Sequence, residues 1–178
     1  MKITIPKLKA ILLYFTENTN TRFLGKVKLM KLIYFLDFLH LKTYGSPITY
    51  DDYINLEHGP IPSTIKNLID SADDDIDNSI LADTVSIEKS DELNIRRIIP
   101  KRKLTERDRQ YFSETELDIL NKVCRRFGEK NTKYIEDESH KEAAWRETKL
   151  FEHIPYEIAT RDPDCLVSKE EIKLLLEI

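Results

Sequence analysis

One stretch decides the fold, the run VKLMKLIYFLDFLHL at residues 27–41. Apolar side chains occupy almost every position of it, so the segment has no polar face to turn toward water. A helix that is apolar all round is buried inside a protein. Gly45 and Pro47 follow the run and end the helix. The sequence therefore predicts a central helix around which the rest of the chain packs.

The segments on either side of this run predict more helix and a little extended chain. Apolar residues between positions 6 and 15 recur at spacings of three and one, which is typical of an amphipathic helix. Residues 48–56 indicate an extended segment. Two prolines flank Ile61, and proline suits a first helical turn because that turn needs no amide hydrogen bond there. We therefore expect a helix to begin at these prolines and to continue through Ile69.

The second half of the chain carries clearer local signals. Residues 85–99 alternate between apolar and polar, which predicts a β-hairpin with its turn near residue 90. Three Ser-x-x-Glu patterns, at 113–116, 139–142 and 168–171, have the form of a capping box at a helix start. We expect the second of them to begin a short helix that includes Trp145. Together the patterns predict a mainly α, α+β fold: a single compact helical domain over residues 1–178, around a central apolar helix, with a small β-hairpin.

Length and composition exclude several classes of protein. The chain has 178 residues, 40% of them apolar and 34% charged, which supports one folded core and rules out a wholly disordered chain. No apolar stretch reaches the length of a bilayer span, and the first residues, Met1 to Thr4, show no apolar signal region. We therefore expect a cytoplasmic protein without a membrane partner.

Charge is segregated along the chain although the net charge is only −4. Residues 1–50 carry eight Lys and Arg against two acids, whereas residues 51–95 carry two Lys against twelve acids. Residues 96–110 are basic again, with seven against two. Such alternation favours oriented contact with a charged macromolecule. Because no single basic face dominates, we do not expect that macromolecule to be a nucleic acid.

Motifs for metals, cofactors and nucleophilic catalysis fail on their spacing. Asp73, Asp75 and Asp77 match the first three ligand positions of a calcium loop, but Asn78 and Thr84 stand where that loop needs glycine and glutamate. Four histidines lie on four different segments, the two cysteines are far apart, and the four glycines form no phosphate-binding loop. We expect no metal and no cofactor.

Two local arrangements stand out physically. Asp37 lies in the middle of the central helix, where a buried carboxylate must find hydrogen-bond donors or a cation. We interpret it as a structural buried polar residue. The sequence His58-Gly59-Pro60 combines a flexible and a rigid position, which holds the histidine ring in a stiff turn. Such a turn serves either as a plain connection or as a recognition element, because rigid loops lose little entropy on binding.

These residues are also the ones through which the chain resembles a known family. The segments KLMKLIYFLDF at 28–38, YGSPIT at 44–49 and HGPIP at 58–62, in this order, resemble the Panacea domain, the SocA-type antitoxin family that is also met as phage-associated proteins. Further segments look like the second half of that family: FSETEL at 112–117, Ser139-His140, WRET at 145–148 and SKEEI at 168–172. The likeness covers nearly the whole chain. Leu36 departs from it, since the family usually has a small residue there, which implies local repacking.

The resemblance implies an antitoxin that neutralises a cognate toxin encoded nearby, by direct complex formation and without catalysis. Some members of the family are adaptors that deliver the toxin to a protease, so blocking and delivery both stay open. A homodimer also stays open. We expect the contact with the partner to lie at His58, Gly59 and Pro60, with His140 and Trp145 nearby and with Lys28 and Lys31 adding charge to the face.

Two alternatives follow from residue types alone. In the first, Asp37, His58 and His140 converge in a cleft as acid and base, which would make the protein a small hydrolase or a nucleotide-acting enzyme. In the second, the protein is a nucleic-acid-binding regulator that uses lysines between 26 and 31 or the basic residues 96–109. Trp145 is either a core residue or part of an interface.

Overall fold

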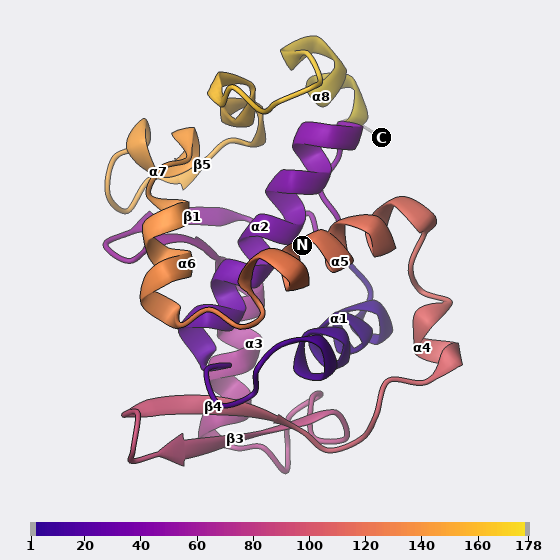
Figure 1. Ribbon diagram of the computed structural model, residues 1–178. Helices are drawn as coiled ribbons and strands as arrows, with labels where there is room; N and C mark the ends of the chain where they lie inside the picture. The colour runs from indigo at the N-terminus through magenta and orange to yellow at the C-terminus, as the bar shows by residue number, and fades with distance from the viewer. Residues whose placement is uncertain (1–2, 177–178) are drawn as a thin grey trace.

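The computed structural model describes residues 3–176 and has the helix α2 (Lys26–Tyr44) at its centre. Nearly every side chain of α2 is buried. The helix ends at Gly45, whose left-handed backbone (φ +87°) lets its N–H bond to the Leu41 carbonyl. Figure 1 shows α2 running through the middle of the molecule, with the other elements around it. The predicted central helix is therefore confirmed.

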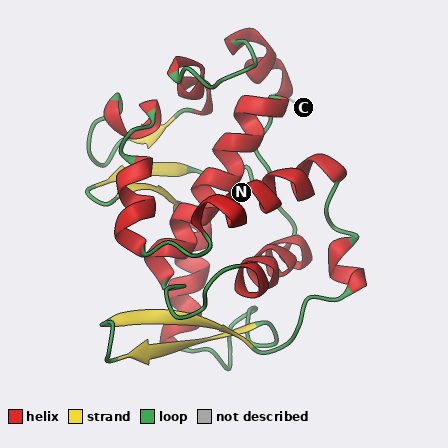
Figure 2. Ribbon diagram, viewed as in Figure 1, coloured by secondary structure: helices red, strands yellow, loops and turns green. Residues whose placement is uncertain are grey.

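Helices surround α2, and the strands form two small sheets. The helices are α1 (Ile5–Asn18), α3 (Ser63–Asp74), α4 (Glu106–Arg109), α5 (Glu114–Phe127), α6 (Thr132–Ser139), α7 (Ala143–Arg146), the 3-10 helix η1 (Tyr156–Arg161) and α8 (Lys169–Leu176). The strands are β1 (Tyr53–Leu56), β2 (Gly59–Pro62), β3 (Val85–Ser90), β4 (Ile95–Pro100) and β5 (His153–Ile154). One antiparallel sheet has the order β2-β1-β5, and β3 pairs with β4 in the predicted hairpin. Figure 2 shows the two sheets apart from each other among the helices, which confirms a mainly α, α+β fold. The ends of the predicted domain, residues 1–2 and 177–178, lie outside the described residues.

An aromatic cluster anchors the three-stranded sheet to α2. Tyr53 of β1 is fully buried, with its ring centroid 5.3 Å from that of Phe38 and 5.8 Å from that of Tyr34. Phe35, on the same helix, packs against Phe127 of α5 with ring centroids 4.4 Å apart. Aromatic pairs at such distances stabilise a core beyond the area that they bury. The cluster fixes where β1 and β2 lie relative to α2.

Two of the three expected capping boxes are present. Ser113 accepts from the amide of Glu116, whose carboxylate accepts from the amide of Ser113, and the same exchange joins Ser168 and Glu171. The third capping box, at residues 139–142, is absent, although the short helix expected to include Trp145 is present as α7. Ser139 is the last residue of α6, and its hydroxyl donates to the Glu136 carbonyl at 2.7 Å. The prediction missed α6 because it took a helix C-terminus for a helix start.

The segment between α2 and α3 also differs from its prediction. Residues 48–52 are not a strand, because Asp37 takes the amide hydrogen bonds of Ile48 and Thr49, and β1 begins only at Tyr53. Both prolines around Ile61 belong to β2, not to the helix that follows. That helix, α3, begins at Ser63 and receives its cap from Asp51 further up the chain.

The segregated charges of the sequence meet one another in the fold. Lys9 bonds to Asp83 at 2.7 Å, and Asp73 pairs with both Lys26 and Arg96. Asp73 is therefore part of an ion-pair network between α2, α3 and β4. Much of the alternating charge that suggested a charged partner is used within the molecule.

Candidate functional site

The turn at His58 reaches the surface at the tip of the β1–β2 hairpin. The side chain of His58 is 68% exposed, and Glu57 beside it is exposed as well. Gly59 and Pro60, which follow directly, are buried. The turn is therefore accessible from solvent at His58, whereas Gly59 and Pro60 lie beneath the surface.

Gly59 stands where any side chain would be strained. Its φ is +95°, a region that residues with a side chain rarely adopt. A Cβ at this position would lie 2.6 Å from the Ser139 hydroxyl oxygen, 2.8 Å from Nζ of Lys31 and 3.3 Å from Cδ2 of His140. The hairpin is thus pressed against α2 and against the end of α6, and only the absence of a side chain permits that approach.

Lys31 holds the turn from inside the molecule. Its side chain is fully buried, and Nζ donates to the Pro60 carbonyl at 2.8 Å. Burial lowers the pKa of Lys31 to about 7, against the opposing effect of the Glu136 carboxylate. Lys31 therefore lies close to the other expected contact residues, but it supports the His58 turn from inside the molecule.

Lys28 has a similar role, close to the start of α2. It is also fully buried, and its Nζ donates to the carbonyls of Gly128 (2.7 Å) and Lys130 (2.6 Å) in the connection after α5. Burial lowers its pKa to about 8. Neither Lys28 nor Lys31 adds charge to an exposed face, contrary to the expectation from sequence, because each ammonium group is used to hold backbone carbonyls.

His140 and Trp145 complete the surroundings of the turn. Their rings stack with centroids 4.0 Å apart, and both residues are half-buried. Nδ1 of His58 lies 3.2 Å from a carboxylate oxygen of Glu136, on the same short helix that ends before His140. The fold thus brings His58, Gly59, Pro60, Lys31, His140 and Trp145 into one region, from three segments that are far apart in sequence.

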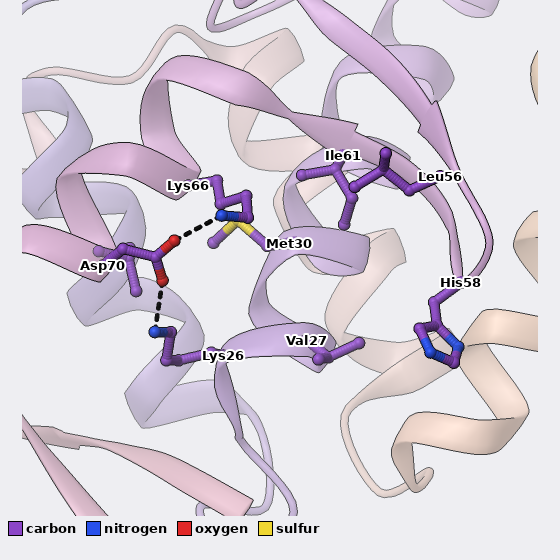
Figure 3. A pocket seen from close by; sticks show the side chains of 9 residues that line it. Lys26, Val27, Met30, Leu56, His58, Ile61, Lys66 and Asp70 are labelled. Carbon is purple, nitrogen blue, oxygen red and sulfur yellow. Dashed lines mark hydrogen bonds and ion pairs between the residues drawn. The ribbon is translucent and has the colours of Figure 1, made fainter. Parts of the chain in front are cut away.

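A groove opens beside His58, between the start of α2, the β1–β2 hairpin and α3 (Figure 3). Its volume is about 210 Å³. The apolar lining residues are Val27, Met30, Leu56, Ile61 and Ile69. Figure 3 shows His58 at one end and the charged group Lys26, Lys66 and Asp70 at the other. We call this feature the His58 groove.

The charged end of the His58 groove is held together by ion pairs. Asp70 accepts from Lys66 at 2.5 Å and also pairs with Lys26, which reaches Asp73 at 3.0 Å. Partial burial of Asp70 acts to raise its pKa, but the hydrogen bonds from the two lysines outweigh it and leave the pKa below the usual value. The carboxylate therefore stays charged and fixes both ammonium groups at the rim.

No local pattern in the sequence predicts this groove. Val27 and Met30 belong to the helix predicted to be buried on all sides, yet Val27 is 42% exposed because α2 begins at the surface. A second missed feature lies beside β5, where Leu150 is 50% and Phe151 74% exposed. The Phe151 amide donates to the Asn55 carbonyl at 2.7 Å, which holds this pair next to β1. The sequence does contain a signal for this exposed pair, since Leu150 and Phe151 follow the polar residues 146–149.

Asp37 is fully buried and lies outside the groove. It accepts from the amides of Ile48 (2.9 Å) and Thr49 (2.8 Å), from the Tyr53 hydroxyl (2.8 Å) and from the Thr49 hydroxyl. Burial raises its pKa to about 6, although these donors favour the charged form. The carboxylate oxygens of Asp37 therefore accept hydrogen bonds that hold the segment between α2 and β1 in place.

The three residues of the enzymatic alternative do not share a cleft in the part of the chain described. The His58 groove includes neither Asp37 nor His140. Within residues 3–176 the structure shows no group of histidine, cysteine and acidic side chains placed to hold a metal ion. No helix among these residues is both long and apolar enough to cross a membrane.

Comparison with known proteins identifies a family. The model of the family described as antitoxin SocA-like, Panacea domain, matches residues 29–146, well over half of the 178-residue chain. The matched range contains most of α2, both strands of the His58 hairpin, and the segment with His140 and Trp145. No curated protein and no solved structure matches. On the strength of this match and of the motifs that it spans, the chain belongs to the SocA-like antitoxin Panacea domain family.

Proposed function

We propose that this protein neutralises a toxin encoded beside it by forming a direct complex, and that residues 1–178 act in this as one domain. The family supports an antitoxin-type role. The observation that carries the proposal is the exposed His58 at the mouth of an apolar groove, on a turn clamped from beneath by Lys31. A preorganised surface of this kind loses little conformational entropy when a partner binds.

The proposed contact surface has three components. His58 supplies a polar ring, Val27 and Leu56 supply apolar groove surface, and Phe151 protrudes as a second apolar contact. Large apolar side chains at the centre of an interface contribute most of its binding energy. Trp145 stacks on His140 behind the turn and supports the surface from inside. We propose that the complex forms in the cytoplasm.

The decisive experiment is co-expression with the toxin from the adjacent gene. We expect growth to be restored and the two proteins to co-purify. Val27→Asp, which places a charge on the exposed wall of the groove, should weaken the complex at least about tenfold. Ile80→Asp is the matched control, because Ile80 is similarly exposed (46%) but does not line the groove. Failure of rescue together with failure to co-purify would overturn the proposal.

The same experiment separates blocking from delivery to a protease. In a host that lacks its cytoplasmic proteases, a blocking antitoxin still restores growth, whereas an adaptor does not. We propose blocking as the primary mode, because the groove and the turn provide a binding surface by themselves. Rescue that is lost in the protease-deficient host would assign the adaptor mode instead.

A further inference from the structure

A second hollow adjoins the His58 groove at Lys26 and Val27. This hollow is lined by Gly25, Lys26, Val27, Asn94, Ile95, Arg96 and Thr132, and its volume is about 350 Å³. Lys26 and Val27 belong to both linings, and the Val27 side chain is exposed between them. The two hollows therefore adjoin at Lys26 and Val27, and we call the pair the channel, which extends from the His58 turn across the start of α2 to the start of β4.

The channel carries an excess of positive charge. Its lining includes the cations Lys26, Lys66 and Arg96, against the lining carboxylate of Asp70. Asp73 lies behind them and pairs with Lys26 and Arg96. The lining itself thus holds three cations and one carboxylate, while Asp73 and Asp74 act on Arg96 from outside the lining. The side chains of Lys66 and Arg96 are 45% and 42% exposed. The surplus favours an anionic group on whatever occupies the channel.

The size of the His58 groove limits its occupant. Pockets for small-molecule ligands usually enclose about 300–1,000 Å³. A cavity of about 150 Å³ holds one benzene ring. At about 210 Å³ and with an apolar lining, the groove suits one large apolar side chain better than a cofactor or a nucleotide. The neighbouring hollow then offers space for the chain that carries this side chain.

We propose that the channel binds an extended segment of the partner protein in which a large apolar side chain enters the His58 groove and an adjacent acidic residue meets Lys66 and Arg96. This inference rests on the proposed function and deepens it, since it gives the chemistry of the toxin segment that is recognised. The apolar lining selects the large side chain, and the surplus of cations selects the acidic neighbour.

Three peptides with the same apolar residue test the inference on the full chain. They are N-acetyl-Phe-Asp-amide, N-acetyl-Phe-Asn-amide and N-acetyl-Phe-Lys-amide, titrated against protein with isotope-labelled methyl groups. We expect saturable shifts at Val27, Met30 and Ile61, with dissociation constants of about 1–10 mM. The Asp peptide should bind about threefold more tightly than the Asn peptide, and the Lys peptide should bind most weakly.

Charge reversal at the rim provides the matched variants. Lys66→Glu should invert the order of the Asp and Lys peptides. Lys133→Glu should leave the order unchanged, because Lys133 also pairs with an aspartate one turn along its helix but does not line the channel. Equal binding of the three peptides, shifts at other methyl groups, or an unchanged order in Lys66→Glu would each overturn the inference.

The outcomes also separate this inference from the proposed function. Toxin rescue without selective peptide binding would leave the antitoxin role intact and refute the chemistry proposed for the segment. Selective peptide binding without rescue or co-purification would support the channel as a peptide site and refute toxin neutralisation.

Discussion

The two β-hairpins of this protein have opposite characters. The β3–β4 hairpin alternates between apolar and polar residues, pairs six residues from each strand and keeps one side in water. The β1–β2 hairpin pairs four residues, is buried along all of β2 and contains two prolines. The first was predicted from sequence and the second was not, although the second carries the candidate site. Alternation reveals a strand only where one face is solvated, whereas a strand that tertiary contacts bury on both faces lacks the pattern.

Gly59→Val should give the largest effect in either hairpin. A β-branched side chain would be strained at φ +95° and would overlap the Ser139 hydroxyl and Nζ of Lys31, so we expect a loss of about 4 kcal/mol in the free energy of unfolding. Asn94→Val is the matched change in the other hairpin, where φ is +49° and the residue is exposed. It should lose about 1–2 kcal/mol. Urea unfolding measures both, and equal losses would show that tertiary packing does not distinguish the two turns.

Burial of the Lys31 amine beneath the β1–β2 hairpin should make the free energy of unfolding depend on pH. Burial lowers its pKa from 10.5 to about 7 in the folded protein, so above pH 7 the unfolded chain holds the proton that the folded protein has lost. Stability should therefore rise by about 1 kcal/mol per pH unit between pH 7 and 9 and fall as the pH drops toward 7. Lys31→Met should remove the rise between pH 7 and 8 and leave the contribution of Lys28 above pH 8.

A second buried lysine serves as the control for that measurement. The pKa of Lys28 falls only to about 8, so Lys28→Met should keep the rise between pH 7 and 8 and reduce it above pH 8. Urea unfolding at intervals of half a pH unit distinguishes the two variants. The same slope in wild-type protein and in Lys31→Met would show that this ammonium group does not lose its proton on folding.

Asp51 tests how the buried hairpin is tied to the helix that follows. Its carboxylate accepts from the amides of Thr64 (3.1 Å) and Ile65 (2.8 Å) at the start of α3 and is itself buried. Asp51→Ala should leave these amides unpaired and lower the free energy of unfolding by about 2 kcal/mol. Asp51→Asn keeps one acceptor oxygen and should lose less. A loss below about 0.5 kcal/mol for the alanine variant would contradict the assigned cap.

The exposed hairpin should give the smallest effect. Lys89 and Asp91 form an ion pair at 3.0 Å near its turn, with side chains 63% and 86% exposed. Pairs of this kind contribute little, so Lys89→Ala should change the free energy of unfolding by less than about 0.5 kcal/mol. Thermal unfolding at low and high salt measures it. A larger loss would mean that the exposed hairpin is as tightly coupled to the core as the buried one.

The sequence predicts most of the residues that surround the His58 turn, but not how some of them are placed. Lys28 and Lys31 are expected from the sequence to add charge to the contact face. In the fold both lysines point inward and hold carbonyls that lie 29 or more residues away in sequence. No pattern near Lys28 or Lys31 in the sequence identifies these carbonyl groups, because the contacts form only when distant segments pack together. The channel was missed for the same reason, because its walls come from α2, α3 and the two hairpins.

The central helix, the capping boxes at Ser113 and Ser168, the exposed hairpin and the family motifs can all be predicted from the amino-acid sequence, because each depends on neighbours within a few residues. The folded molecule is needed to see that the His58 turn rests on Lys31, that β2 and not a helix contains Pro60, and that an apolar groove opens beside the turn. These features depend on contacts between distant segments. Their burial and geometry are therefore set when the elements pack together.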